Sequence, residues 1–134
     1  MKLSDNARKY YEKMFQGGNC SLIDTDPEFA EVFANFAFDE VVNSDDLDDT
    51  TRMLAVLAAL LGCQGTETFK IMLPAALNLG VTPIQVKETV YQAVAYLGIG
   101  RILPFIHIVN ETLNNGGIEL PLPKQATTNA DTRI

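Results

Sequence analysis

Residues 66–97, TETFKIMLPAALNLGVTPIQVKETVYQAVAYL, decide the fold. Apolar residues recur there at intervals of three and four, on both sides of a turn at Gly80, which is typical of two consecutive helices. The second helix begins with a capping box, because Thr82 can cap, Pro83 suits the first helical position and Gln85 can close the box. We therefore expect one helix from about residue 66 to residue 79 and another from residue 82 to residue 97.

Four further helices are expected outward from this pair. Each has apolar residues at helical spacing, and most have a cap or a glycine at their ends. Pro74 should kink the helix that contains it, and Gly98 and Gly100 should stop the helix that precedes them. The four helices run from Ser4 (N-cap) to Gln16, onward from Asp26 (cap) and Pro27, from Met53 to Cys63, and from Arg101 to Leu113.

Two of these helices are strongly apolar. In the helix that starts at Asp26, five residues form one broad apolar face, namely Phe29, Val32, Phe33, Phe36 and Ala37. The helix from Met53 to Cys63 is apolar on every side, so we expect it at the centre of the fold or in a subunit interface.

The chain has the size and composition of one globular domain, residues 1–134. Its 134 residues can bury one core, and 47% of them are hydrophobic. The fold class expected is all-α, a bundle of about six helices. Residues 118–134 show little periodicity, and we expect an extended or disordered tail, or an arm that packs on a neighbouring subunit.

Charge and apolar pattern limit the partners. With 10 Lys and Arg against 17 Asp and Glu, the net charge is -7, which disfavours nucleic acid and anionic membrane surfaces. No signal peptide is recognisable and the apolar runs are too short to span a bilayer, so we expect a cytoplasmic protein. Cys20 and Cys63 lie far apart in sequence and are expected to be free thiols.

Several motifs resemble the carboxymuconolactone decarboxylase and alkyl hydroperoxidase D family. They are Leu47-Asp48 with Thr51-Arg52, the run AALNLGVTP at residues 75–83, and Gln92 with Tyr96-Leu97-Gly98. The likeness covers residues 27–113. It implies an all-α bundle of about six helices, assembly into homotrimers or homohexamers, and carboxymuconolactone decarboxylase or peroxiredoxin-type activity.

The chemistry of that family depends on four positions. The peroxidase-like branch carries C-x-x-C-x-x-x-H on its fourth helix and a carboxylate on the preceding helix, and the decarboxylase branch keeps the histidine. With the register fixed by Ala75 to Asn78, the histidine corresponds to Met72, the cysteines to Gly65 and Thr68, and the carboxylate to Met53. None of these residues titrates, so the family's thiol and proton-transfer steps lose their groups.

The sequence leaves three hypotheses open. In the first, the chain is a catalytically silent member in which Met53, Gly65, Thr68 and Met72 line an adaptable pocket for a small apolar or carboxylated ligand. In the second, it is a divergent enzyme, a decarboxylase or a peroxide-reducing antioxidant protein, with relocated catalytic groups. In the third, it is a structural subunit whose last helix and tail dock a partner.

Three residues are candidates for relocated chemistry. Glu67 either serves the dipole of its helix or acts as an acid or base. Cys63 is either a small buried apolar residue or a reactive thiol. His107 lies on a stripe with Arg101, Pro104 and Glu111, which is either a solvated or interface face or a site where His107 is the base. No metal-ligand spacing is recognisable, and no cofactor is implied.

Overall fold

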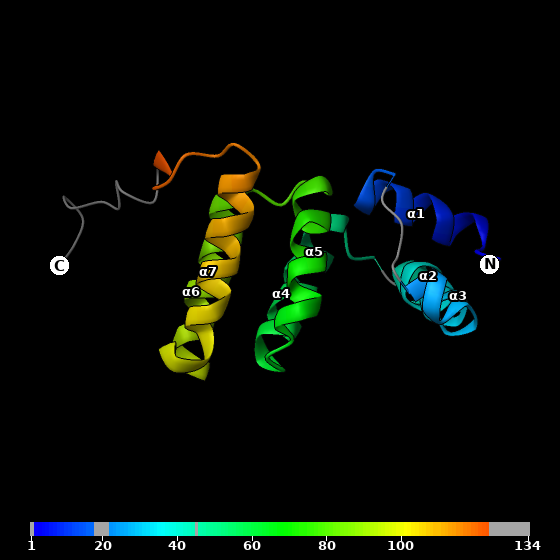
Figure 1. The fold of residues 1–134 in the computed structure, drawn as a ribbon, viewed down its shortest axis with the longest axis horizontal. Coiled ribbons are helices and arrows are strands. Elements are labelled where there is room, and N and C mark those ends of the chain that lie inside the picture. Colours follow the sequence, from blue (N-terminus) through cyan, green and yellow to red (C-terminus); the bar gives the residue numbers. More distant parts are fainter. Residues whose placement is uncertain (1, 18–21, 45, 124–134) are drawn as a thin grey trace. The chain divides into compact units, whose positions relative to one another are not determined.

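The computed structural model describes residues 2–17, 22–44 and 46–123, and within them the chain is helical without strands. Seven α-helices, one π-helical segment and one 3-10 turn follow one another (Figure 1). The all-α prediction is therefore confirmed. The chain divides into two compact units, residues 1–49 and 50–134.

The first unit is built from short helices. They are α1 (Asp5–Phe15), α2 (Leu22–Thr25), α3 (Pro27–Asn35), the π-helical η1 (Phe36–Glu40) and the 3-10 turn η2 (Val42–Ser44). Ser4 caps α1 as predicted, since its side chain accepts a hydrogen bond from the amide of Ala7. At the other end Gln16 adopts the left-handed conformation, with φ of 40°, and closes the helix.

Ser4 also ties α1 to the end of α3 and to η1. Its backbone amide donates to Asn35 Oδ1 at 2.8 Å, and its hydroxyl donates to Asp39 Oδ2 at 2.6 Å. Hydrogen bonds from Ser4, then from Asn43 and Asn6, hold the pKa of Asp39 below its ordinary value. This ionised carboxylate is thus a structural anchor of the first unit.

The helix α3 begins where predicted but differs in two respects. Asp26 occupies the N-cap position without making a capping hydrogen bond, and its carboxylate instead accepts from the Thr25 hydroxyl at 2.7 Å. The side of α3 that is buried carries Ala30 and Ala34, whereas the broad face of large apolar residues is exposed.

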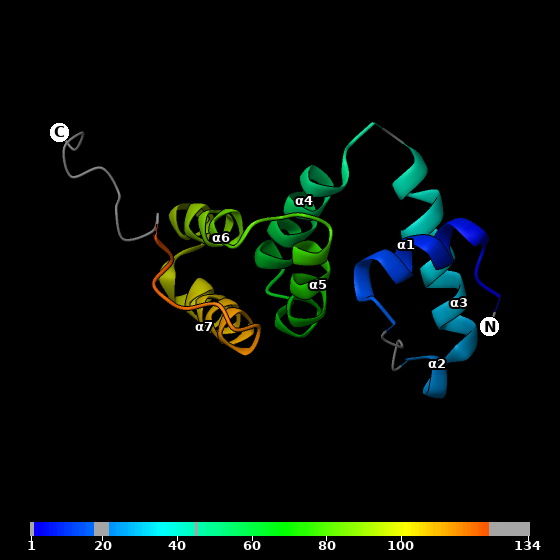
Figure 2. The ribbon, with the colours of Figure 1, turned by 90° about the horizontal axis from the view of Figure 1, so that it is seen from above.

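The second unit contains four longer helices. They are α4 (Asp49–Gly62), α5 (Thr66–Asn78), α6 (Pro83–Leu97) and α7 (Ile99–Asn115). The first residue of α4, Asp49, is counted with the first unit. In both ribbon views α4 runs beside α5, and α6 runs beside α7 (Figure 2). The predicted capping box at the start of α6 is confirmed, because Thr82 Oγ1 accepts from the Gln85 amide and Gln85 Oε1 accepts from the Thr82 amide.

The structure decides one alternative for α4 and corrects the boundary between α6 and α7. Only one stripe of α4 is buried within the chain, made of Met53, Leu57 and Leu61, so α4 is not enclosed at the centre of the fold, and its place in a subunit interface stays a prediction. Gly98 ends α6, but Gly100 stops nothing, because α7 begins at Ile99 and runs through it. A helix can resume after one glycine in an unusual conformation, here Gly98 with φ of 89°.

The core of the second unit is apolar and closely packed. Phe69 of α5 and Phe105 of α7 meet edge to face, with ring centroids 5.1 Å apart and an interplanar angle of 86°. Pro74 and Pro104 lie inside α5 and α7 and do not end them. This packing fixes α5 against α7 and so sets the position of the helix that carries most of the family's site positions.

Residues 118–122 form neither helix nor strand, and Leu122 is buried among them. The extended or disordered tail expected for residues 118–134 stays a prediction. Residues 124–134 of that predicted tail lie outside the described residues. Among the helices described, none is long and apolar enough to cross a membrane.

Candidate functional site

The four positions that the sequence register assigns to the family's catalytic groups lie on α4, on α5 and just before α5. Met53 is 1% exposed, in the buried stripe of α4. Gly65 is half-buried and precedes α5, where Thr68 is exposed and Met72 is half-buried. Thr68 and Met72 are four residues apart and so lie on one side of the helix.

Met53 has the clearest chemical consequence of the four. A carboxylate at such a position would lose its hydration and need an ionic partner, and its pKa would rise. A thioether carries no charge and packs against apolar neighbours without that cost. At this position the chain therefore has the packing of a core residue and no proton to exchange.

The predicted pocket lined by Met53, Gly65, Thr68 and Met72 stays a prediction. The first unit has a hollow on its surface between α1 and η1, with a volume of about 210 Å³ and with Lys9 and Phe38 in its lining. These residues belong to neither α4 nor α5.

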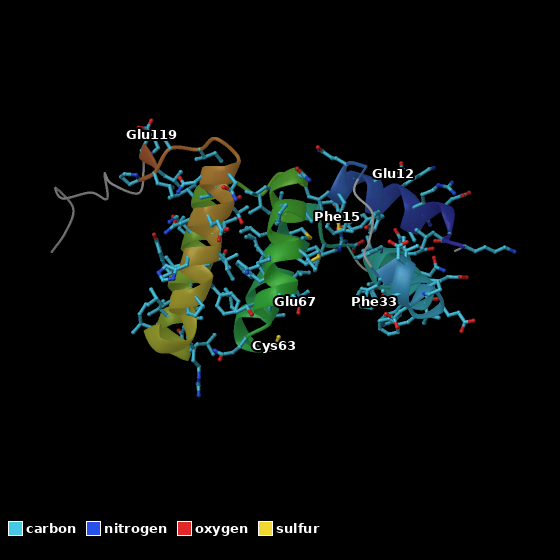
Figure 3. The ribbon with its side chains drawn as sticks, viewed as in Figure 1. Glu12, Phe15, Phe33, Cys63, Glu67 and Glu119 are labelled. Carbon is cyan, nitrogen blue, oxygen red and sulfur yellow. The ribbon has the colours of Figure 1, made fainter. Side chains whose placement is uncertain are left out.

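Cys63 does not lie where the sequence suggested. The expectation of a buried apolar residue is wrong, because Cys63 follows the last residue of α4 and is exposed (Figure 3). Its thiol donates a long hydrogen bond to the carbonyl of Leu60, with 3.7 Å between sulfur and oxygen. A Cβ atom placed on Gly65 would lie 3.4 Å from Cys63 Sγ, so this thiol adjoins the position of the family's first cysteine.

The other candidates for relocated chemistry are on the surface. Glu67 is exposed in the first turn of α5, where its charge suits the positive end of the helix dipole. His107 is exposed on α7, and so are the other three members of its stripe, Arg101, Pro104 and Glu111. The exposure of all four residues agrees with the interpretation of this stripe as a solvated or interface face. The second thiol, Cys20, lies outside the described residues.

Sequence reasoning missed Lys87, the buried charged residue of α6. It is 4% exposed, and its ammonium group donates a hydrogen bond to Asn110 Oδ1 on α7. Burial lowers the pKa of Lys87, because the charged form loses its hydration. The spacing to Val90 and Val94, three and seven residues later, was the available signal that Lys87 shares the apolar side of α6.

Metal chemistry finds no support in this arrangement. Within residues 2–17, 22–44 and 46–123, no three His, Cys, Asp or Glu side chains are grouped so that they could hold an ion.

Comparisons with known proteins point to one family. The sequence profile of the carboxymuconolactone decarboxylase family matches residues 27–111. A 4-carboxymuconolactone decarboxylase from Acinetobacter baylyi is 29% identical over 98 residues, which cover 73% of each chain. No solved structure matches the chain significantly. The chain belongs to the carboxymuconolactone decarboxylase family.

Proposed function

We propose that this family member lacks the family's thiol and proton-transfer chemistry and binds a small apolar ligand at the former catalytic positions. The observation that carries the proposal is the burial of Met53, at the position where the resemblance to the family implies a carboxylate. Met72 adds a second flexible thioether in place of the histidine, and two thioethers suit a variable apolar ligand.

Self-association and a cytoplasmic location belong to the same proposal. Large apolar side chains are exposed in the second unit, among them Ile71, Ile99 and Leu103. Exposed apolar surface of this extent is typical of proteins that assemble. The expectation is a homotrimer or homohexamer, and light scattering at micromolar concentration tests it, with a monomer mass as the contrary result.

Methyl NMR tests the ligand site directly. The chain has four methionines, and labelling their methyl groups with ¹³C reports on each one. A panel of small apolar and carboxylated compounds should shift the signals of Met53 and Met72, while Met14, which lies in the first unit, serves as the internal control. Shifts at Met14 alone, or at no methionine, would contradict the proposed site.

An activity assay on the same sample tests the loss of chemistry. The relative from Acinetobacter baylyi is a 4-carboxymuconolactone decarboxylase, so release of carbon dioxide from that lactone is the measurement to make. We expect no release above the uncatalysed rate. Turnover that survives in Cys63→Ser, Glu67→Gln and His107→Gln variants would point to catalytic groups other than these three.

A second candidate function is peroxide reduction by Cys63 alone. It is favoured by the exposure of this thiol and by its place beside Gly65. The thiolate would attack a hydroperoxide, giving a sulfenic acid and an alcohol, and an external thiol would then reduce the sulfenic acid. A peroxidase rate with added dithiothreitol that disappears in Cys63→Ser would establish this function and refute the silent one.

A further inference from the structure

The exposed side of α3 continues onto η1 as a stripe of four large apolar residues. Phe29 is 59% exposed, Val32 68%, Phe33 48% and Phe36 55% (Phe33 is labelled in Figure 3). Val32, Phe33 and Phe36 lie three, four and seven residues after Phe29, so the four residues lie on one side of the helix. We call these four residues the α3–η1 stripe.

The stripe is large enough to be a binding surface. An aromatic side chain has about 150–250 Å² of surface, so three half-exposed rings and a valine leave roughly 400 Å² of apolar area open to water. The largest apolar patch on an ordinary soluble monomer is of about this size and is often functional.

The stretch of sequence that contains the stripe is strongly acidic. Between Lys13 and Arg52 the sequence has ten Asp and Glu residues and no Lys or Arg. Residues 1–49 carry a formal charge of -8 and residues 50–134 a charge of +1, which together give the -7 of the chain. The negative charge of the protein is thus concentrated in the unit that bears the stripe.

A hollow at the start of the stripe combines both properties. It has a volume of about 320 Å³ and is lined by Asp26, Pro27, Glu28 and Phe29. Two carboxylates beside an aromatic ring suit an arginine or lysine side chain, since the cation can pair with the carboxylates and lie on the ring. This feature is complementary to a partner that carries positive charge beside an apolar surface.

We propose that the α3–η1 stripe binds a basic amphipathic helix of another protein. The apolar side of that helix covers Phe29, Val32, Phe33 and Phe36, and its Lys or Arg residues reach Asp26 and Glu28. A two-fold contact that pairs this stripe with the same stripe of a second copy would bring carboxylates of like charge close together, which is repulsive. An anionic lipid surface is repelled for the same reason.

The test uses the full chain and a designed peptide of about 18 residues, with leucines along one side and lysines along the other. We expect saturable binding in fluorescence anisotropy that weakens as salt is added, because the carboxylates contribute to it. A peptide of the same composition in scrambled order, without an apolar side, should bind far less.

Two matched variants locate the contact. Val32→Lys places a positive charge in the stripe, which repels the lysines of the peptide, and it should weaken binding about tenfold or more. Tyr96→Lys makes the same kind of change at an exposed apolar position of α6 and should leave binding unchanged. Because both side chains are exposed, circular dichroism should show the helical content of the unaltered chain in each variant.

Three results would overturn the proposal. The first is equal affinity for the ordered and scrambled peptides, and the second is equal affinity of Val32→Lys and the unaltered chain. The third is a fall in the mass measured by light scattering in Val32→Lys but not in Tyr96→Lys, since the stripe would then be covered by a second copy of this chain. The proposal and the apolar ligand site fail separately, because the stripe involves neither Met53 nor Met72.

Discussion

Removing the two thioethers of α4 and α5 tests whether they meet. The perturbation is a cycle of Met53→Ala, Met72→Ala and the double variant. Met53 is 1% exposed, so truncating it should lower the free energy of unfolding by about 2–5 kcal/mol. Met72 is only half-buried, and its truncation should lower the free energy of unfolding by roughly 1–2 kcal/mol.

The non-additive part of the cycle carries the information. If the two side chains touch, each single variant already removes their shared contact, so the double variant loses less than the sum of the two by about 0.5 kcal/mol or more. A chain of this length is expected to have roughly 7–20 kcal/mol of stability, so a protein near the middle of that range keeps its fold in all three variants.

Urea unfolding at one fixed protein concentration is the assay, because association makes apparent stability depend on concentration. The denaturant slopes should stay constant across the cycle. Met53→Ala combined with Thr82→Ala, a change at the start of α6, is the control pair and should be additive. Additivity within about 0.3–0.5 kcal/mol for Met53 and Met72 would show that they are independent, and the convergent pocket would then be refuted.

Three further predictions follow from single residues. Burial lowers the pKa of Lys87 in the folded protein, so protonation of Lys87 disfavours the folded state. The free energy of unfolding should therefore rise as pH increases from that lowered pKa toward the ordinary value of 10.5. Urea unfolding at a series of pH values from neutral to alkaline should show this rise in the unaltered chain and not in Lys87→Met. Thr82→Ala removes the N-cap of α6 and should lower the free energy of unfolding by about 0.5–2 kcal/mol, which thermal unfolding would show as a lower melting temperature. Thr82→Ser should retain most of the stability. Cys63 should react with iodoacetamide in the folded protein at a rate near that of a free thiol, as mass spectrometry of the digested protein can show; a rate that rises only in urea would mean that it is buried.

The features that could be predicted from the sequence are the local ones. Ser4 caps α1 and Thr82 with Gln85 caps α6, because these bonds join residues three apart and depend on no other helix. The family's spacing could be recognised for a similar reason, since the run from Ala75 to Pro83 combines a helix end, a turn and a helix start. The assignment of the family's catalytic positions to residues of this chain rests on that register alone and stays a prediction.

The features that could not be predicted depend on which neighbours each helix meets. Periodicity identified an apolar side on α3, but the side that is buried carries Ala30 and Ala34 instead. The sequence predicts Cys63 as the last residue of an apolar helix, whereas α4 ends at Gly62. Lysine usually lies on the surface, and the burial of Lys87 depends on Asn110 of α7, which accepts a hydrogen bond from its ammonium group.

The bonds of Ser4 have a consequence for the synthesis of the chain. Its partners Asn35 and Asp39 lie 31 and 35 residues downstream. A ribosome adds about 5–20 residues per second, so the N-terminal segment waits roughly 2–7 s before these partners exist. A helix as short as α1, with 11 residues, is marginal in water on its own. The segment that forms α1 can therefore be held in place only after the side chains of Asn35 and Asp39 have been synthesised.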